Sequence, residues 1–108
     1  MSAQFDGSEG SPVPLSEASD STQAFQSANP NAIKAHYIGK DIINDIFDQT
    51  GCVGIRVYEG IKDGEREIYI VGVDANGDDQ LGSNHIVADH VKPCPDFCGK
   101  SNPLNSNR

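Results

Sequence analysis

The sequence predicts a small α+β protein with two N-terminal helices, a three-stranded antiparallel β-meander and a C-terminal tail rich in cysteine and proline. Three observations lead to this fold class. Apolar residues recur at helical spacing in the first half of the chain, two β-branched runs flank a glycine turn in the second half, and the tail reads "PCPDFCGKSNPL". A length of 108 residues fits one domain, which we place at residues 15–104.

Residues 1–14 predict a disordered acidic tail. They mix serine, glycine, proline and acidic residues without periodicity. We expect such a segment to bury almost nothing and to be removable with little loss of stability.

The first helix is predicted over residues 15–28 by an apolar stripe at steps of three and four residues: Leu15, Ala18, Thr22 and Phe25. It ends before Pro30, which disfavours helical backbone at the preceding residue.

The second helix is predicted over residues 40–50 and is more strongly amphipathic. Asp41 lies in its first turn, where a negative charge is favourable, and Gly51 follows as a stop. Its apolar face consists of Ile42, Ile43, Ile46 and Phe47.

Two β-branched runs, "CVGIRVY" and "IYIVGV", predict antiparallel strands joined by a turn at Asp63-Gly64. Within the first run, Gly54 predicts a bulge or close backbone packing, and Arg56 is expected to pair with a nearby acid. A third strand is expected over residues 85–91. Helix-on-sheet packing is expected to bury Ile43, Phe47, Ile55, Ile70 and Val73.

Several blocks occur in one order along the chain: "KAHYIGKDI", "GCVGIRVYEG", "VGVDANGDD", "PCPDFC" and "NPLN". From Leu15 to Asn105 this pattern resembles a family of small, uncharacterised proteins of the Bacteroidota. The resemblance implies a small soluble domain without a known activity or an established cofactor.

The net charge of −8 and the pI near 4.5 disfavour binding to nucleic acid or to anionic membranes. The N-terminus lacks the basic and apolar regions of a secretory signal, and no run is long enough for membrane insertion. We therefore expect a cytoplasmic protein, with signal-independent export left open.

The three cysteines allow three interpretations. They are free structural thiols, or Cys94 and Cys98 form a redox-active disulfide, or all three bind a metal. In the metal interpretation, Cys52, Cys94 and Cys98 bind Zn²⁺ together with His90, or with His85 as the alternative fourth ligand. The metal interpretation makes zinc the one candidate cofactor.

"DANGDDQLGSNH" begins like a calcium loop, with Asp74, Asn76 and Asp78 at alternate positions. Asp79 and His85 stand where such a loop needs glycine and glutamate. The segment is therefore better interpreted as a polar turn.

Cys52, His90 and Asp89 offer a thiol, a base and a carboxylate, but no spacing requires them to act together. We therefore expect a non-enzymatic protein-interaction module with a protein partner. The alternative is a zinc-binding or thiol-redox protein that uses Cys52, Cys94 and Cys98.

Overall fold

The computed structural model describes residues 4–106, which form two helices and five strands in two sheets. The chain divides into two compact units, each assembled from two separate stretches. The hairpin unit comprises Met1–Gly10 and Ile38–Val91, and the disulfide unit comprises Ser11–Tyr37 and Lys92–Arg108. None of the helices in residues 4–106 has the length and apolar character needed to cross a lipid bilayer.

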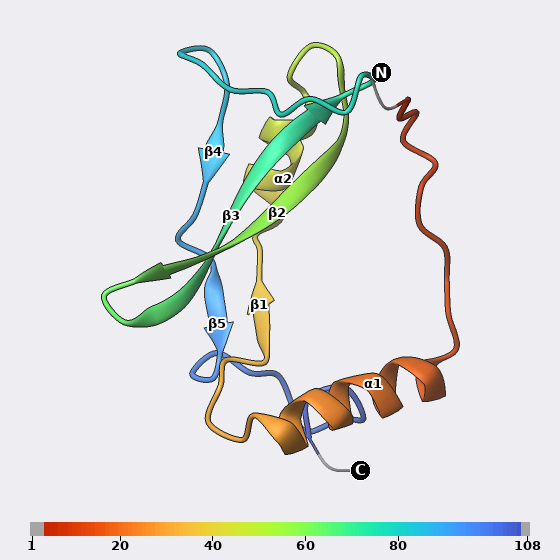
Figure 1. The fold of residues 1–108 in the computed structure, drawn as a ribbon, viewed down its shortest axis with the longest axis vertical. Helices are drawn as coiled ribbons and strands as arrows, with labels where there is room; N and C mark the ends of the chain where they lie inside the picture. Colours follow the sequence, from red (N-terminus) through yellow and green to blue (C-terminus); the bar gives the residue numbers. More distant parts are fainter. Residues whose placement is uncertain (1–3, 107–108) are drawn as a thin grey trace. The chain divides into compact units, whose positions relative to one another are not determined.

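The hairpin unit is organised by two long antiparallel strands, β2 (Cys52–Lys62) and β3 (Glu65–Asp74), shown in Figure 1. They are joined by Asp63 and Gly64, whose φ angles of 53° and 81° are those of a tight hairpin turn. The predicted hairpin is therefore confirmed. The predicted bulge is also confirmed, because the register shifts between Cys52 and Gly54.

The third strand of this sheet, β4, is much shorter than the predicted segment. It spans only Val87–Ala88 and pairs with β3 opposite Ile70 and Val71. A bridge between Val73 and Asp79 extends the ladder on the same edge of β3.

Helix α2 (Lys40–Phe47) packs on this sheet and forms the core. Ile46 and Ile70 are both completely buried, and Val73 is 3% exposed. Ile43 and Ile55 are only partly buried, and the predicted burial of Phe47 is wrong, since it is 47% exposed. The reason is rotation along the helix: Ile46 points at the sheet, so the next residue is turned by about 100° toward its flank.

The disulfide unit contains the first helix as predicted, α1 (Leu15–Ala28). Its remaining regular structure is a two-stranded antiparallel sheet of β1 (Ala35–Tyr37) and β5 (Lys92–Cys94). Ser19 is the buried residue of α1, whereas Leu15 and Phe25 keep 56% and 38% of their surface exposed.

The predicted order of two helices followed by a β-meander is wrong. Strand β1 lies between the two helices, and it pairs with β5, which belongs to the segment expected to be an irregular tail. Both strands have only three residues, too few to show alternation, and Pro93 in β5 has no N–H for a ladder. Proline is tolerated there because each strand of a two-stranded sheet is an edge strand.

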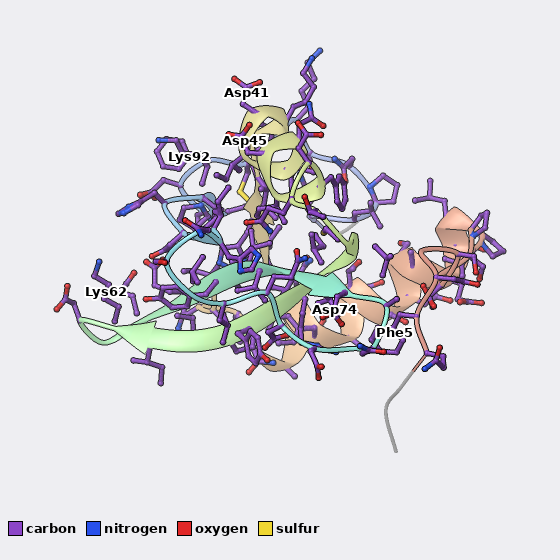
Figure 2. All side chains as sticks on the ribbon, turned by 90° about the horizontal axis from the view of Figure 1, so that it is seen from above. Phe5, Asp41, Asp45, Lys62, Asp74 and Lys92 are labelled. Atoms are coloured by element: carbon purple, nitrogen blue, oxygen red, sulfur yellow. A yellow bond between two sulfur atoms is a disulfide. The ribbon has the colours of Figure 1, made fainter. Side chains whose placement is uncertain are left out.

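Residues 4–10 of the expected tail belong to the hairpin unit, while residues 1–3 lie outside the described part. Phe5 is partly buried, and its backbone N–H donates a hydrogen bond of 2.9 Å to the carbonyl of Ala75. Figure 2 shows Phe5 beside Asp74 at the end of β3. The Arg56 guanidinium lies 6.0 Å from the centre of the Phe5 ring.

Candidate functional site

A disulfide joins Cys94, at the end of β5, to Cys98 in the following loop. Cys94 is held in place by its pairing with Ala35 and by a 2.9 Å hydrogen bond from the Lys34 N–H to its carbonyl. Its surface is only 4% exposed, whereas Cys98 is exposed. The two half-cystines therefore differ in backbone pairing and in access to solvent.

The disulfide borders a pocket of about 570 Å³ within the disulfide unit. Both short strands and the cysteine loop contribute to its lining: Ala35, His36, Tyr37, Lys92, Cys94, Phe97, Cys98, Gly99 and Asn105. Among these described lining residues, Lys92 is the one that carries a full charge at neutral pH, with histidine taken as neutral. The pocket thus combines mainly apolar walls with one cation.

Two aromatic side chains stand at this pocket with much of their surface exposed. Tyr37 is 65% exposed and Phe97 is 56% exposed. The ammonium group of Lys92 lies 4.9 Å from the centre of the Phe97 ring, within the range of a cation–π interaction. This contact fixes the cation at the pocket wall instead of leaving it on a free side chain.

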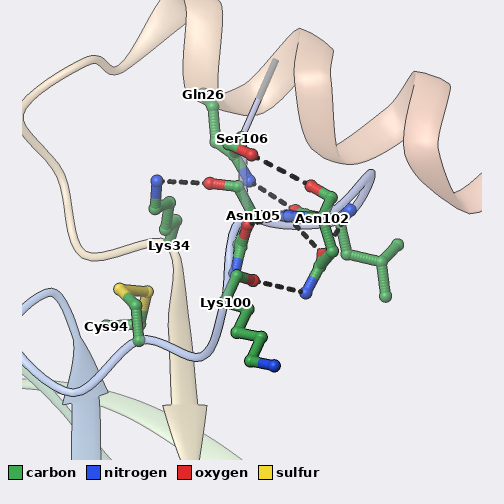
Figure 3. The surroundings of a disulfide bond; sticks show 9 residues. Gln26, Lys34, Cys94, Lys100, Asn102, Asn105 and Ser106 are labelled. Carbon is green, nitrogen blue, oxygen red and sulfur yellow. Dashed lines mark hydrogen bonds between the residues drawn. A yellow bond between two sulfur atoms is a disulfide. The ribbon is translucent and has the colours of Figure 1, made fainter. Parts of the chain in front are cut away.

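The C-terminal turn contributes Asn105 to the pocket lining. Asn102 and Asn105 build this turn through reciprocal hydrogen bonds, in which the backbone N–H of each donates to the side-chain oxygen of the other (Figure 3). The turn is attached to the rest of the unit at two points. Lys34 Nζ donates to the carbonyl of Asn105 at 2.5 Å, and Gln26 Nε2 donates to the carbonyl of Leu104 at 2.9 Å. These bonds hold Asn105 in the pocket lining.

His36 also lines the pocket, at the middle of β1. Its Nε2 is buried, and among the described residues it has no hydrogen-bond partner. Buried polar side-chain atoms are usually hydrogen-bonded, so this nitrogen is an exception.

Of the residues predicted to bind zinc, the structure brings together only Cys94 and Cys98, and it joins them covalently. Cys52 belongs to the hairpin unit, where its Sγ donates to the carbonyl of Gly54 at 3.2 Å. His90 and His85 are exposed, and Nδ1 of the latter lies 2.7 Å from the carbonyl of Leu81. Within residues 4–106, no three histidine, cysteine or acidic residues are grouped to hold a metal. The zinc site stays a prediction.

The calcium-like segment is a polar turn in the structure. Oδ1 of Asp74 accepts hydrogen bonds from the backbone N–H groups of Asn76 and Asp78 at 2.9 and 3.1 Å. The leading carboxylate is therefore used to stabilise the turn itself.

Asp79 forms the polar centre of the hairpin unit. It pairs with Arg56 at 2.5 Å, as expected for an arginine in this strand, and it accepts a hydrogen bond from the Tyr58 hydroxyl. The hydrogen bond from Tyr58, reinforced by Arg56, lowers the pKa of Asp79, while the same carboxylate raises the pKa values of Tyr58 and Arg56.

Two glutamines that the sequence did not mark as important connect the loop after β3 to the turn between α2 and β2. Gln49 Nε2 donates to Gln80 Oε1 at 3.1 Å, and Gln80 Nε2 donates to the carbonyl of Thr50 at 2.8 Å. A Cβ on Gly72 would lie 2.5 Å from Gln80 Oε1 and 2.8 Å from Gln49 Nε2. The absence of a side chain at Gly72 therefore leaves the space that Gln49 and Gln80 occupy.

The chain matches no protein-family model, and no curated protein or solved structure proved similar to it. The resemblance to small Bacteroidota proteins consequently stays a prediction.

Proposed function

We propose that the chain is a protein-interaction module that binds an extended acidic segment of a partner protein at the disulfide pocket. The observation that carries this proposal is the Lys92 ammonium, which lies over the Phe97 ring in a pocket whose described lining contains no acidic residue and no other lysine or arginine. A carboxylate of the partner is its natural counterpart.

The exposed aromatic rings supply the apolar part of the binding energy. Tyr37 and Phe97 keep 65% and 56% of their surface exposed in the free chain. Aromatic residues are enriched in interface hot spots because they bury a large area with little loss of rotamer freedom. A partner side chain inserted between them would be removed from water beside the cation.

The two-stranded sheet favours a partner in extended conformation. Among the described residues, β1 and β5 pair only with each other, so each has a second edge. A peptide strand can add to such an edge through its backbone while it places alternate side chains in the adjoining pocket. This arrangement supports binding of a strand in preference to a helix.

The experiment selects ligands from a random heptapeptide display library on the immobilised protein and then measures affinity by calorimetry. We expect the selected peptides to be enriched in aspartate and glutamate, and Lys92→Ala to weaken their binding about tenfold, which corresponds to about 1.4 kcal/mol. Lys100→Ala removes the same charge outside the pocket lining and should leave affinity unchanged. Peptides without acidic residues, or equal binding to both variants, would contradict the proposal.

The thiol-redox alternative is favoured by one specific observation, the disulfide between Cys94 and Cys98. Zinc binding would require those two sulfurs in the reduced state, since thiolates are the ligands. Metal analysis of the reduced protein, with Cys94→Ser as the control, tests whether the chain binds zinc. The cytoplasmic location stays a prediction beside these proposals.

A further inference from the structure

We infer that the disulfide takes part in thiol–disulfide exchange, that Cys98 is the sulfur attacked by an incoming thiolate, and that Cys94 is the leaving thiol, which displaces the bound thiol when the exchange runs in reverse. The co-reactant is a dithiol on a protein or a small molecule. This reaction occurs in the pocket of the proposed function but does not require an acidic peptide.

The unequal settings of the two half-cystines determine the direction of attack. Both half-cystines line the pocket, but Cys98 is the exposed one, so a thiol that enters the pocket reaches it more readily. Cys94 is 4% exposed and belongs to the β1–β5 ladder, where Ala35 is its partner. An attacking sulfur is thereby kept from Cys94 while its approach to Cys98 remains open.

The loop geometry keeps the leaving thiol close to the attacked one. The N–H of Phe97 donates a 2.7 Å hydrogen bond to the carbonyl of Pro93, which closes the cysteine loop through backbone alone. The strand pairing and this bond are formed by backbone atoms and include neither sulfur. After cleavage, we expect Cys94 to stay beside Cys98 and to be positioned to displace a bound thiol.

The exchange proceeds in two displacement steps. The thiolate of the dithiol attacks Cys98 Sγ, a mixed disulfide forms, and the S–S bond breaks with its electron pair on Cys94 Sγ. The second thiolate of the dithiol then attacks the dithiol's first sulfur, which is bonded to Cys98 in the mixed disulfide. The dithiol closes to a disulfide, and Cys98 is released as a thiolate. Cys94 and Cys98 take up the two protons that the dithiol has lost, so two electrons pass from the dithiol to the protein.

The first test compares single-thiol proteins in a Cys52→Ser background. With Cys94→Ser, the remaining thiol is Cys98, and with Cys98→Ser it is Cys94. We expect 4,4′-dithiodipyridine to react at least about tenfold faster with Cys98, because thiol exchange depends on access to the attacked or attacking sulfur. Equal rates, or a faster Cys94, would overturn the assignment. Circular dichroism of each variant shows that the folded state is compared.

The second test uses the native disulfide and needs no cysteine variant. Reduction by dithiothreitol, followed by mass spectrometry after alkylation, should proceed in proportion to the dithiothreitol concentration. A rate that is independent of dithiothreitol and equal to the unfolding rate would show that the sulfurs react only after unfolding, and would overturn the inference. Lys100→Ala, outside the pocket lining, should leave the rate with dithiothreitol within about twofold of the native value. Because this rate is measured without any peptide, a failure of peptide binding and a failure of exchange are distinguishable.

Discussion

The two units of this chain are stabilised by different means. The hairpin unit holds all of the buried aliphatic side chains that the structure describes, centred on Ile46 and Ile70. The disulfide unit buries Ser19 and Cys94 and depends on a covalent bond, two short strands and an asparagine turn. A small structure without an apolar core commonly needs such a cross-link.

Charge separates the two units as sharply as burial does. The hairpin unit contains thirteen acidic and four basic residues, a net charge of −9, whereas the disulfide unit contains three acidic and four basic residues, a net charge of +1. The overall charge of −8 therefore describes the hairpin unit and hides the other. An acidic ligand is disfavoured by the whole-chain charge but is compatible with the unit that carries Lys92.

The largest expected effect comes from the apolar core. Ile46→Ala should lower the free energy of unfolding by about 2–5 kcal/mol, because it leaves a cavity at a fully buried position. Phe47→Ala, at the next residue, is the matched control. Phe47 is 47% exposed, so we expect this variant to lose less than about 1.5 kcal/mol of unfolding free energy. Urea unfolding followed by circular dichroism measures both. If the two variants were equally destabilised, α2 would not pack as described.

The next effect comes from the glutamine pair of the hairpin unit. Gly72→Ala should cost about 1–3 kcal/mol, since its Cβ would meet hydrogen-bonded amides that have no free space. Gly54→Ala, on the neighbouring strand, has no atom within 4 Å of the added carbon and should be nearly neutral. Thermal unfolding of both variants decides whether the pair is rigid. A neutral Gly72→Ala would show that the glutamines move aside.

Reduction of the disulfide should affect one unit and spare the other. Opening a five-residue loop costs about 2 kcal/mol in the chain-entropy account, which corresponds to about thirtyfold less protection from hydrogen exchange. We expect this loss at the Lys34 N–H, which bonds to the carbonyl of Cys94, and no change at the core strand around Ile70. Amide exchange measured by NMR before and after reduction is the test. Loss of protection in both units would show that they unfold together.

The sequence predicted the hairpin unit well because its signals are long. The β-branched runs of β2 and β3 and the helical spacing of α2 extend over many residues, and the Asp63-Gly64 turn lies between the two runs. All of these features appear in the structure. The exact face of α2 was less predictable, because Ile46 and Phe47 are adjacent and equally apolar in sequence.

Apart from α1, the disulfide unit was poorly predicted, because its two strands are short and pair over a long distance in sequence. Ala35–Tyr37 and Lys92–Cys94 each have three residues, and a proline in the second argues against a strand. The pocket residues Tyr37 and Phe97 were missed for the same reason. The cysteine spacing was the one sequence feature that drew attention to this segment. It allowed three interpretations of the sulfur atoms, and Phe97 lies in the loop between the two cysteines.

The smallest expected effect concerns acid and sharpens the electrostatic difference between the units. Asp79 has a pKa below its usual 3.8, mainly through the hydrogen bond from Tyr58 and also through Arg56. A lowered pKa means that the folded state binds this proton less tightly than the unfolded state. The stabilisation by Asp79 is therefore complete at pH values above the ordinary pKa of 3.8 and is lost as the pH falls through the lower pKa of the folded state.

Asp79→Asn should remove this component, so that the stability of the variant declines less steeply below about pH 4 than that of the native chain. Asp78→Asn changes the exposed neighbouring carboxylate and should keep the native slope. Urea midpoints measured from pH 6 to 2.5 test the assignment. Identical slopes for Asp79→Asn and the native protein would mean that the interactions of the Asp79 carboxylate with Tyr58 and Arg56 contribute nothing to the pH dependence of stability.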